Sequence, residues 1–106
     1  MIVASKEGFE RWLIKHGYSN WTSAGNPSTT HQYAYWVERV MDQEGYKGYS
    51  SFAEDIQIII TKYGDYGPMK KFGDKGHKIV INALQRFFNY LLDDCNYVLK
   101  PRTFFN

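Results

Sequence analysis

The sequence predicts an all-α fold, a compact four-helix domain formed by residues 1–94. Apolar residues recur at intervals of three and four along several segments, which is the spacing of one helix face. Stretches rich in Gly, Pro, Ser and Asn separate these segments. The chain has 106 residues, 43% hydrophobic and 18% aromatic, so it can bury one core and is not disordered. Residues 95–106 lose the periodicity and are expected to be a tail, or a linker to a downstream domain.

The first expected helix begins after Ser5, which can cap its free amides, and runs to about His16. Gly17 is placed to end it, because glycine readily adopts the left-handed conformation that follows many helices. The segment 18–28 is rich in turn-forming residues and is expected to be a loop. The face predicted to be buried carries Phe9, Trp12, Leu13 and His16.

The second expected helix begins at Pro27 or Ser28 and ends at Gly45. A third helix is expected to begin with a capping box at residues 51–54, in which the serine and glutamate side chains satisfy each other's backbone amides. The run 56–63 that continues it contains adjacent isoleucines, which also suit a strand. A helix is favoured, because the apolar residues keep helical spacing and no second strand is available for pairing.

The last expected helix, residues 75–94, is the one around which the domain is organised, and a glycine-rich loop at 64–75 precedes it. One face carries large apolar side chains, each contributing roughly 1.5–3 kcal/mol when fully buried. These residues are Val80, Ile81, Ala83, Leu84, Phe87, Phe88, Leu91 and Leu92. The opposite face carries a polar row, namely Lys78, Asn82, Gln85, Arg86 and Asn89. Such side chains reach base edges in a major groove, but they are also ordinary on any exposed helix face.

Positive charge is concentrated just before the last helix, although the net charge is only +2. Residues 1–61 contain five Lys or Arg against seven Asp or Glu. Residues 62–86 contain six against two, and residues 87–106 are balanced. A local basic patch on a weakly charged domain is typical of a protein that binds a polyanion.

The sequence indicates neither a membrane span nor a catalytic centre. No apolar run approaches the roughly 18 residues of a transmembrane helix, and no secretory leader is recognisable. Cys95, the only cysteine, excludes an internal disulfide, fits a reducing cytoplasm and lacks the positive surroundings that activate a thiol. His16, His31 and His77 lack metal-ligand spacing, and residues 73–76 do not form a phosphate loop. We therefore expect a cytoplasmic protein that is not an enzyme and needs no cofactor.

Four short motifs follow one another along the chain: Phe9-x-x-Trp12-Leu13, Gly17-Tyr18-Ser19, Thr30-x-x-Tyr33 and Asn82-Ala83-Leu84-x-x-Phe87-Phe88-x-Tyr90-Leu91. Their order resembles the N-terminal SAM-like, core-binding domain of phage integrases and other tyrosine recombinases. The resemblance covers residues 5–92, and its motifs are degenerate. The chain departs from the family pattern in an extra loop at 20–26 and in the glycine-rich stretch at 64–76.

The resemblance implies DNA binding without chemistry, because that family keeps its catalytic residues in a separate C-terminal domain. It also implies that the second helix, the last helix and the loop before the last helix face one side of the duplex. The expected partners are double-stranded DNA and either a downstream catalytic domain or further copies in a homo-oligomer on DNA. The DNA-binding residues under this hypothesis are Thr29, Thr30, Lys70, Lys71, Lys75, His77, Lys78, Asn82, Gln85 and Arg86.

Each of these residues has an expected role. The three lysines 70, 71 and 75, with His77, contact phosphates and release counterions. Thr29 and Thr30 offer hydroxyls and free helix amides to a further phosphate. The last helix presents Lys78, Asn82, Gln85 and Arg86 toward the groove.

Two alternatives remain. A helical protein–protein interaction module is suggested by nineteen aromatic residues, several of them in loops, namely Tyr18, Trp21, Tyr46, Tyr49 and Tyr66. The same residues can instead pack over the helix ends as an enlarged core. The segment 72–79 also resembles the Gly-x-x-Gly loop of KH domains, which require a three-stranded sheet that the sequence does not predict.

Overall fold

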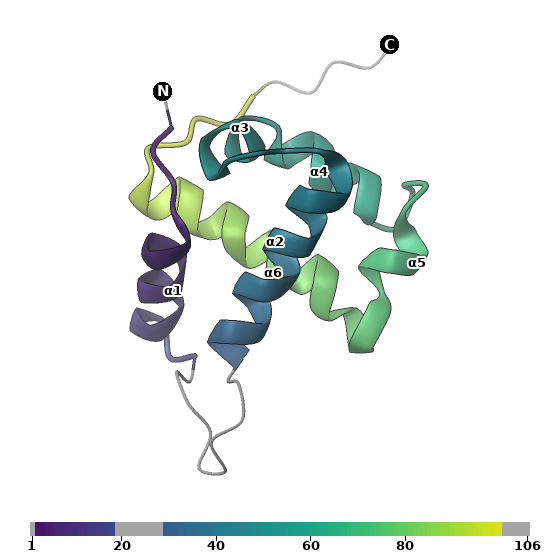
Figure 1. Cartoon of the computed structure of the whole chain (residues 1–106), viewed down its shortest axis with the longest axis horizontal. Coiled ribbons are helices and arrows are strands. Elements are labelled where there is room, and N and C mark those ends of the chain that lie inside the picture. The colour runs from purple at the N-terminus through teal and green to yellow at the C-terminus, as the bar shows by residue number, and fades with distance from the viewer. Residues whose placement is uncertain (1, 19–28, 101–106) are drawn as a thin grey trace.

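The computed structural model describes residues 2–18 and 29–100, and over these residues the fold is all-α (Figure 1). Its helices are α1 (Lys6–Lys15), α2 (Thr29–Glu44), α3 (Tyr49–Glu54), α4 (Ile56–Tyr63), α5 (Lys70–Gly73) and α6 (Lys75–Asp94). Helices α2 and α6 cross at the centre, α1 packs against both of them on one side, and α5 lies on the opposite side (Figure 1). No helix among the described residues is both long and apolar enough to cross a membrane.

The ends of α1 follow the sequence prediction. The hydroxyl of Ser5 accepts a hydrogen bond from the Gly8 amide at 3.0 Å, which caps the first turn. At the other end, the Gly17 amide donates to the carbonyl of Ile14 and the Tyr18 amide donates to the carbonyl of Leu13. This pair of bonds closes the helix behind a left-handed glycine. The predicted start of the second helix, at Pro27 or Ser28, lies outside the described residues.

The expected third helix is divided in two, and its predicted capping box is wrong. The helix already begins after Gly48, so Ser51 lies inside α3 and its hydroxyl donates to the Gly48 carbonyl at 3.1 Å. The chain leaves helical geometry at Asp55, where φ is −105° and ψ is 14°. Phe52 of α3 and Ile56 of α4, on the two sides of the break, are both fully buried in the core. The continuous helix that the local pattern predicts is therefore interrupted, although its apolar residues still face the core.

Helix α6 provides the centre of the core, as predicted. The side chains of Val80, Leu84, Phe87 and Leu91 are fully buried. The ring of Phe87 meets aromatic rings from three helices: Phe9 of α1 at 5.2 Å, Phe52 of α3 at 5.8 Å and Tyr90 of α6 at 5.8 Å between centroids. Two details differ from the prediction: Leu92 is 37% exposed, and Tyr90, which was not assigned to the core, is buried.

The predicted loop 64–75 contains the short helix α5, which is fixed against the end of α4. The Met69 amide donates to the carbonyl of Lys62 at 3.0 Å. A Cβ at Gly73 would lie 2.1 Å from the carbonyl oxygen of Tyr63, so only glycine permits this approach of the two backbones. The close contact sets α5 beside the start of α6.

The start of α6 is not a regular helix, contrary to the predicted continuous helix over 75–94. Gly76, His77 and Lys78 all have positive φ, at 59°, 58° and 68°. Right-handed helix geometry begins at Ile79. Left-handed backbone costs a non-glycine residue roughly 1–2 kcal/mol, so His77 and Lys78 hold a strained turn that packing must stabilise.

The described part of the tail packs back on the domain. The side chain of Gln57 in α4 accepts hydrogen bonds through Oε1 from the Tyr97 hydroxyl and the Lys100 amide, both at 2.8 Å. Residues 95–100 therefore run along the α4 side of the molecule, as in one of the two alternatives for the tail. The linker alternative concerns positions 101–106, which lie outside the described residues.

Candidate nucleic-acid interface

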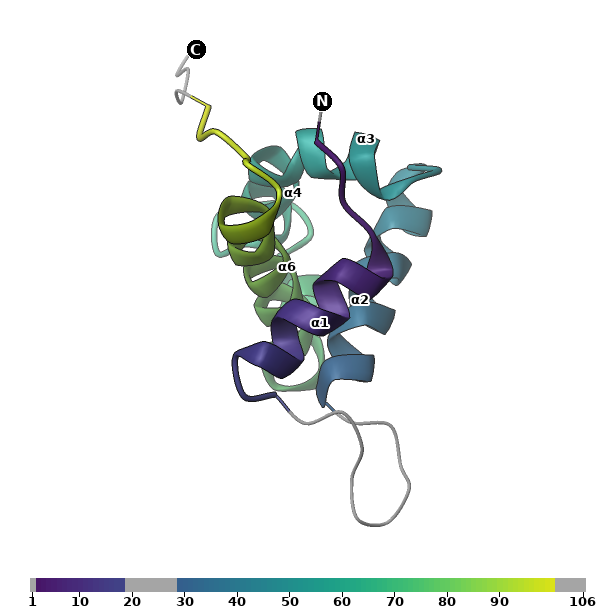
Figure 2. The same cartoon turned by 90° about the vertical axis from the view of Figure 1, so that its left-hand side faces the viewer.

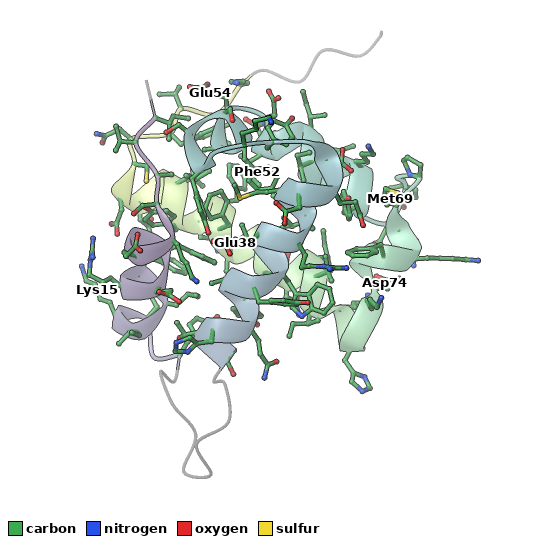
Figure 3. The ribbon with its side chains drawn as sticks, viewed as in Figure 1. Lys15, Glu38, Phe52, Glu54, Met69 and Asp74 are labelled. Atoms are coloured by element: carbon green, nitrogen blue, oxygen red, sulfur yellow. The ribbon has the colours of Figure 1, made fainter. Side chains whose placement is uncertain are left out.

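Four of the predicted DNA-binding residues lie at the corner where α5 meets the start of α6. Lys71, Lys75, His77 and Lys78 are all exposed there. None of the four forms an ion pair within the described part of the chain. Asp74 marks this corner in Figure 3, on the side of the molecule opposite Lys15 of α1. The clustering of lysines in the sequence is therefore also a cluster in space.

Lys70 belongs to the same corner but is already paired. Its Nζ lies 2.5 Å from Oδ2 of Asp74, one helical turn away. The hydrogen bond between them raises the pKa of Lys70 and lowers the pKa of Asp74. An anionic partner must compete with this carboxylate, so Lys70 contributes less than its unpaired neighbours.

Lys75 is held over aromatic rings. Its Nζ lies 5.2 Å from the centroid of Phe72 and 6.0 Å from the centroid of Trp36. A cation at this distance from a ring face is attracted by the ring's quadrupole. The contact orients the ammonium group without neutralising its charge.

The polar row of α6 remains open to solvent. Gln85 and Asn89 are exposed and Asn82 is half-buried. The described tail contacts α4 and, through Tyr97, Phe88 of α6, and it leaves Gln85 and Asn89 exposed. Because Lys78 lies in the left-handed turn, it does not continue the row as the next helical position, contrary to the prediction. The open row therefore consists of Asn82, Gln85 and Asn89.

Arg86 does not belong to the open row. Its Nε donates to the hydroxyl of Tyr18 at 2.6 Å, which draws the side chain toward the end of α1. The Tyr18 ring in turn meets Tyr33 of α2 edge-on, with centroids 5.6 Å apart. Arg86 thus links three helices, and its guanidinium is not directed freely toward a groove.

The predicted phosphate contact of the Thr30 hydroxyl is also wrong. Its side chain is fully buried, and among the described residues its Oγ1 has no hydrogen-bond partner. A phosphate cannot reach that hydroxyl. Thr29 is half-buried at the first position of α2 and remains accessible in part. The sequence could not distinguish the two, because which of two adjacent threonines faces the core depends on how α2 docks.

The solvent-facing sides of α2 and α6 point away from each other. The two helices pack face to face, with α6 on the left and α2 on the right in Figure 2. The resemblance implied that the second and last helices contact one side of a duplex together. This arrangement does not bring their outer faces together, so a partner on the outer face of α6 meets α5 and the left-handed turn instead.

The loop aromatic residues mostly pack on the core. Tyr46 donates to Asp55 at 2.6 Å, and this bond raises its pKa to about 12. Burial, with a hydrogen bond to Glu38, also raises the pKa of Tyr49. Tyr66 is fully exposed, and Trp21 lies outside the described residues. For Tyr18, Tyr46 and Tyr49 the enlarged-core interpretation holds.

No three His, Cys, Asp or Glu side chains gather as metal ligands in the described part of the chain. Cys95 is buried at the end of α6, and burial raises the pKa of its thiol. The sheet that a KH domain requires is missing too, since residues 2–18 and 29–100 contain no strand.

Comparison of the chain with protein-family models, curated proteins and solved structures found no match.

The sequence interpretation missed two features of this corner. It did not assign Phe72 or Trp36 to the site, although both rings lie beside Lys75. Phe72 follows Pro68-Met69 and two adjacent lysines, a stretch with no periodic signal, so only the fold could place its ring.

Proposed function

We propose that the chain is a DNA-binding domain, non-catalytic by itself, that holds a duplex through the basic corner. The corner comprises Lys71, Lys75, His77 and Lys78, and Asn82 and Gln85 extend from it along α6. The observation that carries the proposal is a set of exposed, unpaired cations beside an uncovered polar helix face.

Unpaired lysines also occur on α1 and at Lys47 among the described residues, but at the corner three of them lie within eight positions of the chain. Lys62 pairs with Glu44 at 2.7 Å, and Lys100 pairs with Glu54 at 3.5 Å. At the corner, Lys70 is matched by a carboxylate, and within residues 2–18 and 29–100 no other lysine of the corner is. Unpaired cations gathered in one place attract a polyanion, whereas paired ones gain little from it.

The roles differ between the lysines and the amides. The cations contact phosphates and supply affinity that falls with salt. Asn82 and Gln85 are the types that reach base edges, although only two such residues give modest specificity. We infer that further specificity comes from a partner: a downstream catalytic domain, as in the tyrosine recombinases, or a second copy on DNA. The reducing cytoplasm fits the single cysteine.

Fluorescence anisotropy with a labelled duplex of roughly two helical turns tests the proposal. The variant Lys71→Gln/Lys75→Gln/Lys78→Gln removes three cations from the corner. Each phosphate contact contributes about 0.9 to the slope of log affinity against log salt, so the slope should fall by up to about 2.7.

The matched control removes the same charge from other surfaces. Lys6 and Lys15 of α1 and Lys47 of the α2–α3 loop are all exposed. Their triple glutamine variant should keep most of the slope and affinity. Equal losses in both variants, or no duplex binding even at low salt, would overturn the basic-corner interface.

A protein-interaction module is the second candidate, because apolar side chains are exposed beside the tail. Val3, Val98 and Leu99 are 78%, 79% and 59% exposed and line a shallow hollow of about 630 Å³. A second copy of the chain is the simplest partner for such a patch. Sedimentation velocity tests it: association that Leu99→Lys abolishes supports this candidate, and a monomer at all concentrations excludes self-association.

A further inference from the structure

A surface hollow lies within the basic corner. It has a volume of about 400 Å³ and is lined by Pro68, Met69, Lys71, Phe72 and Lys75. Its lining combines three apolar side chains with two ammonium groups and contains no carboxylate. That combination suits a ligand with an apolar planar part and an adjacent negative charge.

The aromatic part of the lining is rigidly held. Phe72 meets Trp36 edge-on at 6.1 Å between centroids, and on another side it meets Tyr63, a fully buried residue, at 5.9 Å. Trp36 also meets Tyr35, which is 53% exposed, at 5.1 Å. A row of aromatic rings therefore runs from the buried core through Phe72 and Trp36 to the surface of α2.

Cations stand beside these rings. Lys75 lies over both Phe72 and Trp36, and Lys71 lines the same hollow without an ion pair among the described residues. Surfaces that bind single-stranded nucleic acid are built in this way, with aromatic rings for the bases and lysines for the backbone. A base inside a duplex has both faces covered by its neighbours in the stack and cannot use such rings, whereas an unpaired base can.

We propose that this hollow binds an unpaired nucleotide in a single-stranded segment next to the duplex. The base lies against Phe72 and Met69, and its flanking phosphates meet Lys71 and Lys75. The inference rests on the proposed function, because it extends the same basic corner. The two ammonium groups and the lack of a carboxylate in the lining favour a polyanion, and the aromatic rings favour one with exposed bases.

The experiment compares three oligonucleotide probes: a blunt duplex, the same duplex with a short thymine overhang at one end, and the single strand alone. Wild-type protein should bind the overhang duplex about fivefold or more tightly than the blunt one, as one stacked base is expected to provide. Phe72→Leu keeps an apolar side chain but removes the ring, so it should abolish the overhang gain, whereas blunt-duplex affinity should fall only by the small amount due to the lost ring contact with Lys75. Phe88→Leu is the matched control, since Phe88 is half-buried and contacts Tyr97 of the tail.

Tyr35→Ala provides a second variant, because an exposed residue can be removed without unfolding the domain. It should reduce the overhang gain in part.

The two proposals can be overturned by different results. An overhang gain of less than twofold, or one that survives Phe72→Leu, overturns the nucleotide site while duplex binding stands. If wild-type protein does not bind the blunt duplex but binds the single strand, and Phe72→Leu weakens that single-strand binding, the duplex proposal alone is overturned. Equal displacement of the oligonucleotide by a poly(Glu-Tyr) peptide overturns the nucleotide assignment.

Discussion

Replacing Thr30 with valine should stabilise the protein. The Thr30 side chain is fully buried, and Oγ1 has no hydrogen-bond partner among the described residues. A buried hydroxyl that has lost water without gaining a partner costs roughly 1–3 kcal/mol. Valine has nearly the same shape and the same branching at Cβ, so the helix pays no additional χ1 entropy. Taking the lower end of the range, the free energy of unfolding should rise by about 1 kcal/mol.

Urea and thermal denaturation followed by far-ultraviolet circular dichroism measure this effect. For a domain of this size, 1 kcal/mol corresponds to a rise in Tm of roughly 4–8 °C. Thr29→Val is the control, because Thr29 is only half-buried and should change stability little. Duplex affinity should be the same for Thr30→Val and wild type. Destabilisation by Thr30→Val, or a loss of DNA binding in the folded variant, would refute the reasoning that the hydroxyl is buried, unpaired and remote from the interface.

Three further predictions follow from the backbone and from one hydrogen bond. Gly73→Ala should destabilise the protein by about 2 kcal/mol in urea denaturation, because its Cβ would lie 2.1 Å from the Tyr63 carbonyl oxygen; unchanged stability would contradict the close contact. Lys78→Gly should stabilise by about 1 kcal/mol, since φ is 68° there, whereas Lys78→Ala removes the same charge and should give no such gain. The pKa of Tyr46 is raised to about 12 by its bond to Asp55, so the stability it contributes is complete below pH 10 and is lost as pH rises through about 12. Asp55→Asn should lower that pKa toward 10.0 in an absorbance titration of tyrosinate, and an unshifted titration would argue against the bond.

The candidate site was predictable to the extent that it depends on composition. Lys71, Lys75 and Lys78 are close in sequence, and a short connection cannot carry them far apart, so the basic corner could be anticipated. The exposure of Gln85 follows from its position opposite the apolar stripe. The removal of Arg86 from that face could not be anticipated, because its partner Tyr18 is 68 positions away.

The hollow beside Lys75 was still less predictable from the sequence, because its rings are brought together only by the fold. Phe72 belongs to a helix of four residues whose place is set by contact with the end of α4. Trp36 comes from α2 and reaches the same corner only because α2 and α6 cross. Neither ring could be assigned to a surface from its own neighbours in the sequence.

The sequence by itself determined the helical class, the two ends of α1 at Ser5 and Gly17, and the buried face of α6. These features depend on capping and on periodicity, which act over a few residues. Only the tertiary structure decided the break at Asp55, the left-handed turn at 76–78 and the burial of Thr30. The burial of Thr30 depends on how α2 docks on segments distant in sequence, and neither the break nor the turn follows from periodicity or capping, which describe only local preferences.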